Sequence, residues 1–166
     1  MRQDQRHNPN TLFYSLLDLL RQNGGGERSL GLCSGKLDWP KRGVYFFMES
    51  GEVRSASGTG PRIVRVGTHA LKPGSATSLW GRLSQHRGQK NTGGGNHRGS
   101  IFREIVGAAL SAREGYDFST WGGGNSAARD IRLRELPLEQ EVSAILGEMP
   151  VLWLAVNGDP GRSTLR

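Results

Sequence analysis

Residues 61–68 read PRIVRVGT, a short β-strand pattern that ends in glycine and carries Arg65 near its centre. A second β-rich run, GVYFFME at residues 43–49, precedes it. The segment between the two runs is rich in serine and glycine, which favours a connecting loop. Together the two runs predict a β-hairpin at the centre of the fold.

The alternation of side chains along a strand predicts the two faces of this hairpin. Tyr45 and Phe47 are expected on one face of the first strand, and Arg65 on the matching face of the second. The opposite face is predicted to be an aliphatic and aromatic core, with Val64 and Val66 side by side. If that face packs as core, Tyr45 and Arg65 emerge together on the second face, where a site could lie.

Further elements follow from hydrophobic periodicity and from turn residues. Helices are predicted at residues 11–22, 77–88, 100–115 and 137–149, and strands at 131–136 and 150–156. Pro137 is expected in the first turn of the last helix, where its missing N–H costs nothing. The mixture predicts an α+β fold, a small antiparallel or mixed three-stranded sheet flanked by helices, with an N-terminal helix and an extra C-terminal strand.

Charge favours an acidic partner, above all nucleic acid. The chain has 166 residues, a net charge of +7 and a pI near 10.3. Of its 22 basic residues, 18 are arginine, whose planar fork grips phosphate with two hydrogen bonds. A basic surface alone is equally compatible with a protein-interaction domain.

Several protein classes are disfavoured by composition. Cys33 is the single cysteine, so neither an internal disulfide nor a cysteine-based zinc site is expected. No apolar run approaches the roughly 18 residues that span a bilayer. The polar N-terminus, MRQDQRHNPN, does not resemble a secretory signal, and these features together favour a cytoplasmic location.

An ordered set of motifs resembles the GIY-YIG nuclease family. The set consists of GVY at residues 43–45, RVG at 65–67, a helix with GRLSQH at 81–86, and a later helix with the Leu-Glu pair at 138–139. The arginine–histidine helix is most similar to the restriction-endonuclease-like branch. The resemblance covers residues 43–147 and implies a nuclease domain at 43–166, preceded by a helix-and-loop extension at 1–42.

The resemblance also implies site residues and a cofactor. Tyr45 matches the tyrosine of the first motif, Arg82 the family's essential arginine, and His86 the histidine one turn later. Arg65 stands where the second motif has a tyrosine, which departs from the family pattern. Glu139 best matches the glutamate that holds a divalent metal, Mg²⁺ or Mn²⁺, with Glu141 as a close alternative.

The chemistry of phosphodiester hydrolysis suits these residue types. It requires a deprotonated water and stabilisation of charge on the phosphoryl oxygens. Arg82 and His86 lie four residues apart on one helix and project from the same side, so the arginine can bind the phosphate and the histidine can relay a proton. Arg65 would favour the phenolate form of Tyr45 or bind phosphate itself. A single carboxylate suffices for Mg²⁺, which keeps several of its waters.

Additional contacts with nucleic acid are expected around the start of the helix at residues 100–115, where His97, Arg98 and Arg103 could bind phosphate. Base-specific contacts would come from loops such as 88–99 and 119–130. The sequence therefore predicts a Mg²⁺-dependent DNA endonuclease that could act as a homodimer. Two alternatives stay open, an inactive nucleic-acid-binding module of the same fold and a basic protein-interaction domain.

Overall fold

The computed structural model describes residues 8–24, 27–55, 57–70 and 77–157. Its helices are α1 (Pro9–Asn23), α2 (Leu79–Arg87), α3 (Ile101–Glu114) and α4 (Arg129–Glu148), with short 3₁₀ helices η1 (Leu30–Leu32) and η2 (His97–Gly99). Its strands are β1 (Arg28–Ser29), β2 (Gly43–Val53), β3 (Pro61–His69) and β4 (Pro150–Ala155). The α+β class is therefore confirmed, as are the predicted hairpin, the N-terminal helix and the C-terminal strand.

The four strands form one antiparallel sheet in the order β1-β4-β2-β3. The long hairpin strand β2 lies between β3 and β4, so it is hydrogen-bonded on both sides. The sheet has one more strand than predicted for the core. The two-residue strand β1 pairs with β4 and is too short to leave a pattern in the sequence.

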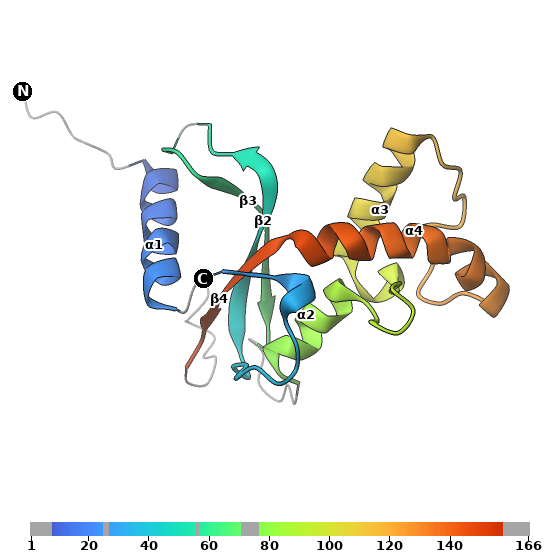
Figure 1. Ribbon diagram of the computed structural model, residues 1–166, viewed down its shortest axis with the longest axis horizontal. Coiled ribbons are helices and arrows are strands. Elements are labelled where there is room, and N and C mark those ends of the chain that lie inside the picture. Colours follow the sequence, from blue (N-terminus) through green and yellow to red (C-terminus); the bar gives the residue numbers. More distant parts are fainter. Residues whose placement is uncertain (1–7, 25–26, 56, 71–76, 158–166) are drawn as a thin grey trace, which may run out of the picture.

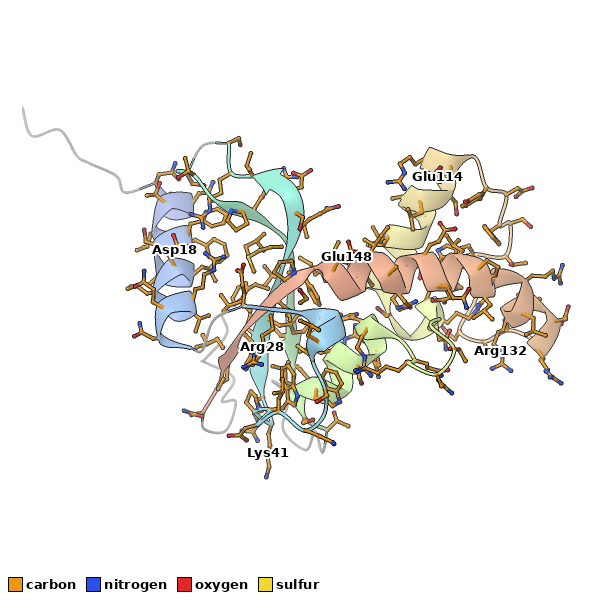
Figure 2. The ribbon with its side chains drawn as sticks, viewed as in Figure 1. Asp18, Arg28, Lys41, Glu114, Arg132 and Glu148 are labelled. Carbon is orange, nitrogen blue, oxygen red and sulfur yellow. The ribbon has the colours of Figure 1, made fainter. Side chains whose placement is uncertain are left out.

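Helices cover both faces of the sheet (Figure 1). On one face α1 packs on the sheet through a cluster that includes Leu17, Phe46, Met48 and Leu152. On the other face lie α2, α3 and α4, and Figure 2 shows side chains filling the space on each side of the sheet. The larger core forms there, around Tyr45 and Phe47. Alternate residues of β2 therefore serve two cores, which explains why its pattern is apolar on both faces.

A register shift between Phe47 and Met48 changes the predicted faces of β3. Arg65 pairs with Phe47 and Ile63 pairs with Met48, which leaves Val64 as the extra residue. Val64 accordingly packs with the larger core while Ile63 packs with the α1 cluster. The prediction that Val64 and Val66 share one face was wrong, because a β-bulge reverses the alternation.

The predicted strand at residues 131–136 was also wrong, because this segment is the N-terminal part of α4. Buried positions in α4 are Glu135, Leu138, Glu139, Val142 and Leu146, which recur at helical spacing. Pro137 therefore lies inside the helix, not in its first turn. It is tolerated because it lies on the exposed side, where water can satisfy the carbonyl group that loses its partner.

No helix among the described residues is both long enough and apolar enough to cross a membrane.

Candidate functional site

The centre of the site is a direct contact between Tyr45 of β2 and His86 of α2. The phenol oxygen lies 2.8 Å from His86 Nε2. Tyr45 is 1% exposed and His86 is fully buried. The first-motif tyrosine and the helix histidine, separated by 41 positions in the chain, thus form one hydrogen-bonded pair.

Two residues at the start of α3 contact His86, one at its second ring nitrogen and one at its backbone carbonyl. Ser100 Oγ lies 2.7 Å from His86 Nδ1, and it also accepts the Arg103 backbone N–H as the N-cap of α3. The Arg103 guanidinium donates to the His86 carbonyl at 2.8 Å. Both ring nitrogens of His86 are therefore engaged, so that one accepts a hydrogen bond while the other donates one.

His86 is neutral near pH 7. Burial, followed by the positive charges of Arg82, Arg65 and Arg103, lowers the pKa of His86 to about 3. This differs from the sequence expectation of a pKa near neutrality, because neither burial nor the arginine cluster is visible in a helix motif. A neutral imidazole at this position can accept a hydrogen bond from the phenol of Tyr45.

Two arginines flank the pair without an acidic partner. Arg65 lies with its guanidinium carbon 5.6 Å from the centre of the Phe102 ring, and its buried Nε has no hydrogen-bond partner. Arg82 is half-buried and donates to Gln85 Oε1 at 2.8 Å and to the Gly99 carbonyl at 3.1 Å. Neither guanidinium forms an ion pair with a carboxylate of the described residues. Uncompensated positive charge therefore lies beside His86, as an anion-binding site requires.

Gly67, the last residue of the RVG motif, makes room for the tyrosine. It pairs with Tyr45 across the hairpin. A Cβ atom at position 67 would lie 2.1 Å from Tyr45 Cζ, so the phenol ring occupies the space that any other side chain would fill. Gly43, the first residue of the other motif, is close to different atoms. A Cβ atom there would meet the Leu154 carbonyl on β4.

Glu139 lies in a second buried cluster that adjoins the first through Arg103. Its Oε1 accepts the backbone N–H of His97 at 2.6 Å and lies 3.0 Å from His97 Nδ1. Its Oε2 accepts from Arg103 Nε at 2.9 Å and Nη2 at 2.5 Å. Although burial opposes the shift, the hydrogen bonds from His97 and the charge of Arg103 lower the pKa of the Glu139 carboxyl.

A comparison with protein families identifies the chain. A family model described as a GIY-YIG domain matches residues 4–166. The chain belongs to the GIY-YIG family. This is a nuclease family, and the resemblance seen in the sequence is therefore confirmed. No curated protein and no solved structure matches the chain.

The GIY-YIG motifs now have defined places in the fold. Gly43, Val44 and Tyr45 open β2, while Arg65, Val66 and Gly67 lie on the facing strand β3. The match includes α1, which packs directly on the sheet. The division into an extension at 1–42 and a nuclease domain at 43–166 stays a prediction.

Glu139 as placed does not fit a magnesium ligand. Mg²⁺ needs a carboxylate oxygen with a free lone pair, and it keeps several of its own waters. Each oxygen of Glu139 already faces two nitrogen atoms, and the residue is 4% exposed. The described residues contain no group of three or more His, Cys, Asp or Glu side chains that could hold a metal ion. Glu141, the alternative, is oriented elsewhere on α4, with Tyr116 Oη at 3.4 Å from its carboxylate.

Of the three residues predicted to bind phosphate near α3, His97 and Arg103 are buried and Arg98 is half-buried. His97 stacks on Trp121 with ring centres 3.8 Å apart, and Arg103 is enclosed between α2 and α4. Arg98 forms a two-pronged ion pair with Glu135, at 2.6 and 2.9 Å. These contacts favour a structural role, in which the three side chains hold η2 and the loop after α3 against α4.

Sequence reasoning missed two members of these clusters. Ser100 was expected only as the first residue of the helix at 100–115, yet its hydroxyl caps α3 and orients the ring of His86. Glu135 was hidden by the wrong strand prediction at residues 131–136. Its spacing of four from Glu139 would have placed both acids on one helical face, had the segment been predicted as helix.

Proposed function

We propose that this GIY-YIG domain is an endonuclease that hydrolyses DNA phosphodiester bonds at the Tyr45–His86 pair. The observation that carries the proposal is the 2.8 Å contact between these two side chains, flanked by two arginines that have no ion-pair partner in the described part of the chain. A phosphate group between Arg65 and Arg82 would supply the missing negative charge. It would also bring the scissile bond next to the only tyrosine–histidine hydrogen bond of the described residues.

The proposed reaction divides the work between the pair and the two arginines. Tyr45 takes a proton from the attacking water while its own phenol proton passes to His86 Nε2. The water oxygen bonds to phosphorus, the P–O bond to the leaving nucleotide breaks, and the leaving oxygen takes a proton from solvent. Arg65 and Arg82 stabilise the charge that develops on the phosphoryl oxygens.

Binding of the phosphate would favour the proton transfer. In the free protein, the two arginines help to keep His86 neutral. A bound phosphate compensates their charge, which raises the affinity of His86 for the proton that it receives. Because Tyr45 is almost fully buried, DNA binding must also displace the side chains that cover it.

The nicking of supercoiled plasmid DNA tests the proposal, with Arg65→Ala compared with Arg62→Ala. Arg62 is an exposed arginine of the same strand, paired with Glu52, and serves as a matched control. Loss of one group that stabilises developing charge costs about 100-fold to 1000-fold in rate, so Arg65→Ala should nick far more slowly than Arg62→Ala. Equal rates for the two variants would remove Arg65 from the mechanism.

Dependence on Mg²⁺ or Mn²⁺ stays a prediction, since none of the described residues offers a free carboxylate in this site. The same nicking assay tests it by comparing reactions with EDTA and with each added metal. Cleavage of a symmetric site on both strands would favour a homodimer, which a measurement of mass in solution tests.

The two alternative functions give different results in the same experiments. An inactive nucleic-acid-binding module is favoured by the arginine at position 65 and by the burial of Tyr45, and it would bind DNA without nicking it. Its affinity would fall steeply with salt, because phosphate contacts release counterions. A protein-interaction domain would show no DNA binding even at low salt.

A further inference from the structure

A polar groove lies beside Arg82, between the C-terminal half of α2 and the loop at residues 88–99. Its volume is about 520 Å³. Four amide side chains line it, those of Gln85, Gln89, Asn91 and Asn96, and we call it the amide groove. All four are exposed, and no described residue that lines the groove is acidic.

The amide groove adjoins the proposed cleavage site. Arg82 donates to the side chain of Gln85 and to the carbonyl of Gly99, and both of these residues line the groove. A DNA strand whose phosphate binds Arg82 would therefore place a neighbouring base at the groove. Amide side chains are suited to that contact, because they carry a donor and an acceptor side by side.

The hydrogen bonds within the protein distinguish Asn91 from the other three amides. Gln85 Oε1 accepts from Arg82, Gln89 Oε1 from the Thr92 hydroxyl, and Asn96 Oδ1 from the backbone N–H of Arg98. Each of these oxygens already accepts one hydrogen bond within the protein, which leaves it one free lone pair. Asn91 has no hydrogen-bond partner among the described residues, and its donor and acceptor are both free.

The loop that carries Asn91 is braced by its own hydrogen bonds. Gln89 N–H donates to the Gly94 carbonyl at 2.7 Å, and Gly94 N–H donates to the Thr92 hydroxyl. Gln140 of α4 donates to the Thr92 carbonyl at 2.8 Å, which fixes the loop to the helix. Asn91 is thus presented from a preorganised turn, which reduces the entropy lost when it binds.

We propose that the amide groove reads bases next to the scissile phosphate, and that Asn91 recognises adenine. An amide with both groups free can bind the N6 and N7 atoms of adenine in the major groove with two hydrogen bonds. The NH₂ groups of the other three amides would contact acceptors on neighbouring bases, such as guanine O6 and N7 or thymine O4. This inference rests on the proposed nuclease function and names its specificity-determining residue.

The test is cleavage of a randomised duplex DNA library, followed by sequencing of the cut ends. The wild-type protein should enrich adenine at one fixed position near the cut. Asn91→Ala should lower that preference by about 5-fold to 150-fold, the discrimination of one two-pronged amide–adenine contact. The matched control is Asn10→Ala, an exposed asparagine of α1 on the other face of the sheet, and it should keep the preference.

Three results would overturn the proposal: no base preference in the wild type, an unchanged preference in Asn91→Ala, or loss of the preference in Asn10→Ala. If the wild type does not cleave, the nuclease proposal fails, and the same library is then selected for binding. Adenine enrichment in the bound DNA that is lost in Asn91→Ala would still support the amide groove. Bound DNA without that enrichment would refute it.

Discussion

The buried neutral state of His86 predicts a specific loss of stability in mild acid. The pKa of His86 falls from 6.5 to about 3 on folding, because of burial and then the neighbouring arginines. Below pH 6.5 the unfolded chain therefore binds a proton that the folded chain does not, and the free energy of unfolding decreases as the pH falls. One pKa unit corresponds to about 1.36 kcal/mol, so the loss is about 2 kcal/mol at pH 5 and about 4 kcal/mol at pH 3.

Urea unfolding at about pH 7.5 and about pH 5 measures this loss for the wild type and for His86→Gln. Glutamine does not titrate, so the variant should lose about 2 kcal/mol less than the wild type between these two conditions. The pH is kept at 5 or above so that only His86 contributes to the difference. The Glu139 carboxyl has a lowered pKa, so its contribution to the free energy of unfolding is lost only in more acidic solution. An equal loss in both proteins would show that His86 is not a buried neutral histidine.

Two further substitutions test the surroundings of the site. Glu139→Gln should lower the free energy of unfolding by about 3–5 kcal/mol, because it leaves the buried Arg103 charge without its partner. The control Glu141→Gln should change it by less than about 0.5 kcal/mol. Urea unfolding compares the two variants, and equally small effects would contradict the buried ion pair. Gly67→Ala should displace the Tyr45 ring and reduce plasmid nicking, because the new Cβ would lie 2.1 Å from Cζ. Gly81→Ala, which meets its nearest atom at 3.5 Å and lies inside α2, should keep activity and gain about 0.5–1 kcal/mol of stability; wild-type nicking by both variants would show that the ring tolerates a side chain at position 67.

The sequence was sufficient for the elements whose pattern is local. The hairpin, the helix with Arg82 and His86, and the last strand all carry a clear period, and each is present in the structure. The shared face of Tyr45 and Arg65 also followed from alternation, because the bulge lies beyond Arg65 at Val64. The prediction that Tyr45 and Arg65 share a site therefore needed only the alternation of side chains along two strands.

The errors arose where tertiary contacts override a local pattern. Residues 131–136 alternate like a strand, but Glu135 is buried by its ion pair with Arg98, which no hydrophobic pattern can reveal. On α3, Ile101 and Ile105 have the spacing of an apolar helical face, yet both are more than half exposed. The helix instead buries Phe102 and Arg103, because the guanidinium finds Glu139 in the interior.

The state of a charged group was the least predictable feature of the site. The motif assigned Glu139 to a metal. In the structure its carboxylate instead faces two nitrogen atoms of His97, on η2 and 42 positions away, and two of Arg103 on α3. The neutral state of His86 likewise depends on three arginines from different elements. Such environments arise only when the chain has folded, so residue type and spacing cannot supply them.

The most direct test of the catalytic role of the Tyr45–His86 pair is the rate of plasmid nicking by Tyr45→Phe, measured beside its DNA binding at low salt. The substitution removes a single oxygen atom and keeps the ring between β3 and α2. General acid–base catalysis contributes about 100-fold to 10,000-fold, so we expect nicking to fall by at least about 100-fold while DNA binding is retained. A variant that nicks plasmid DNA within a few fold of the wild-type rate would show that the phenol takes no part in the reaction.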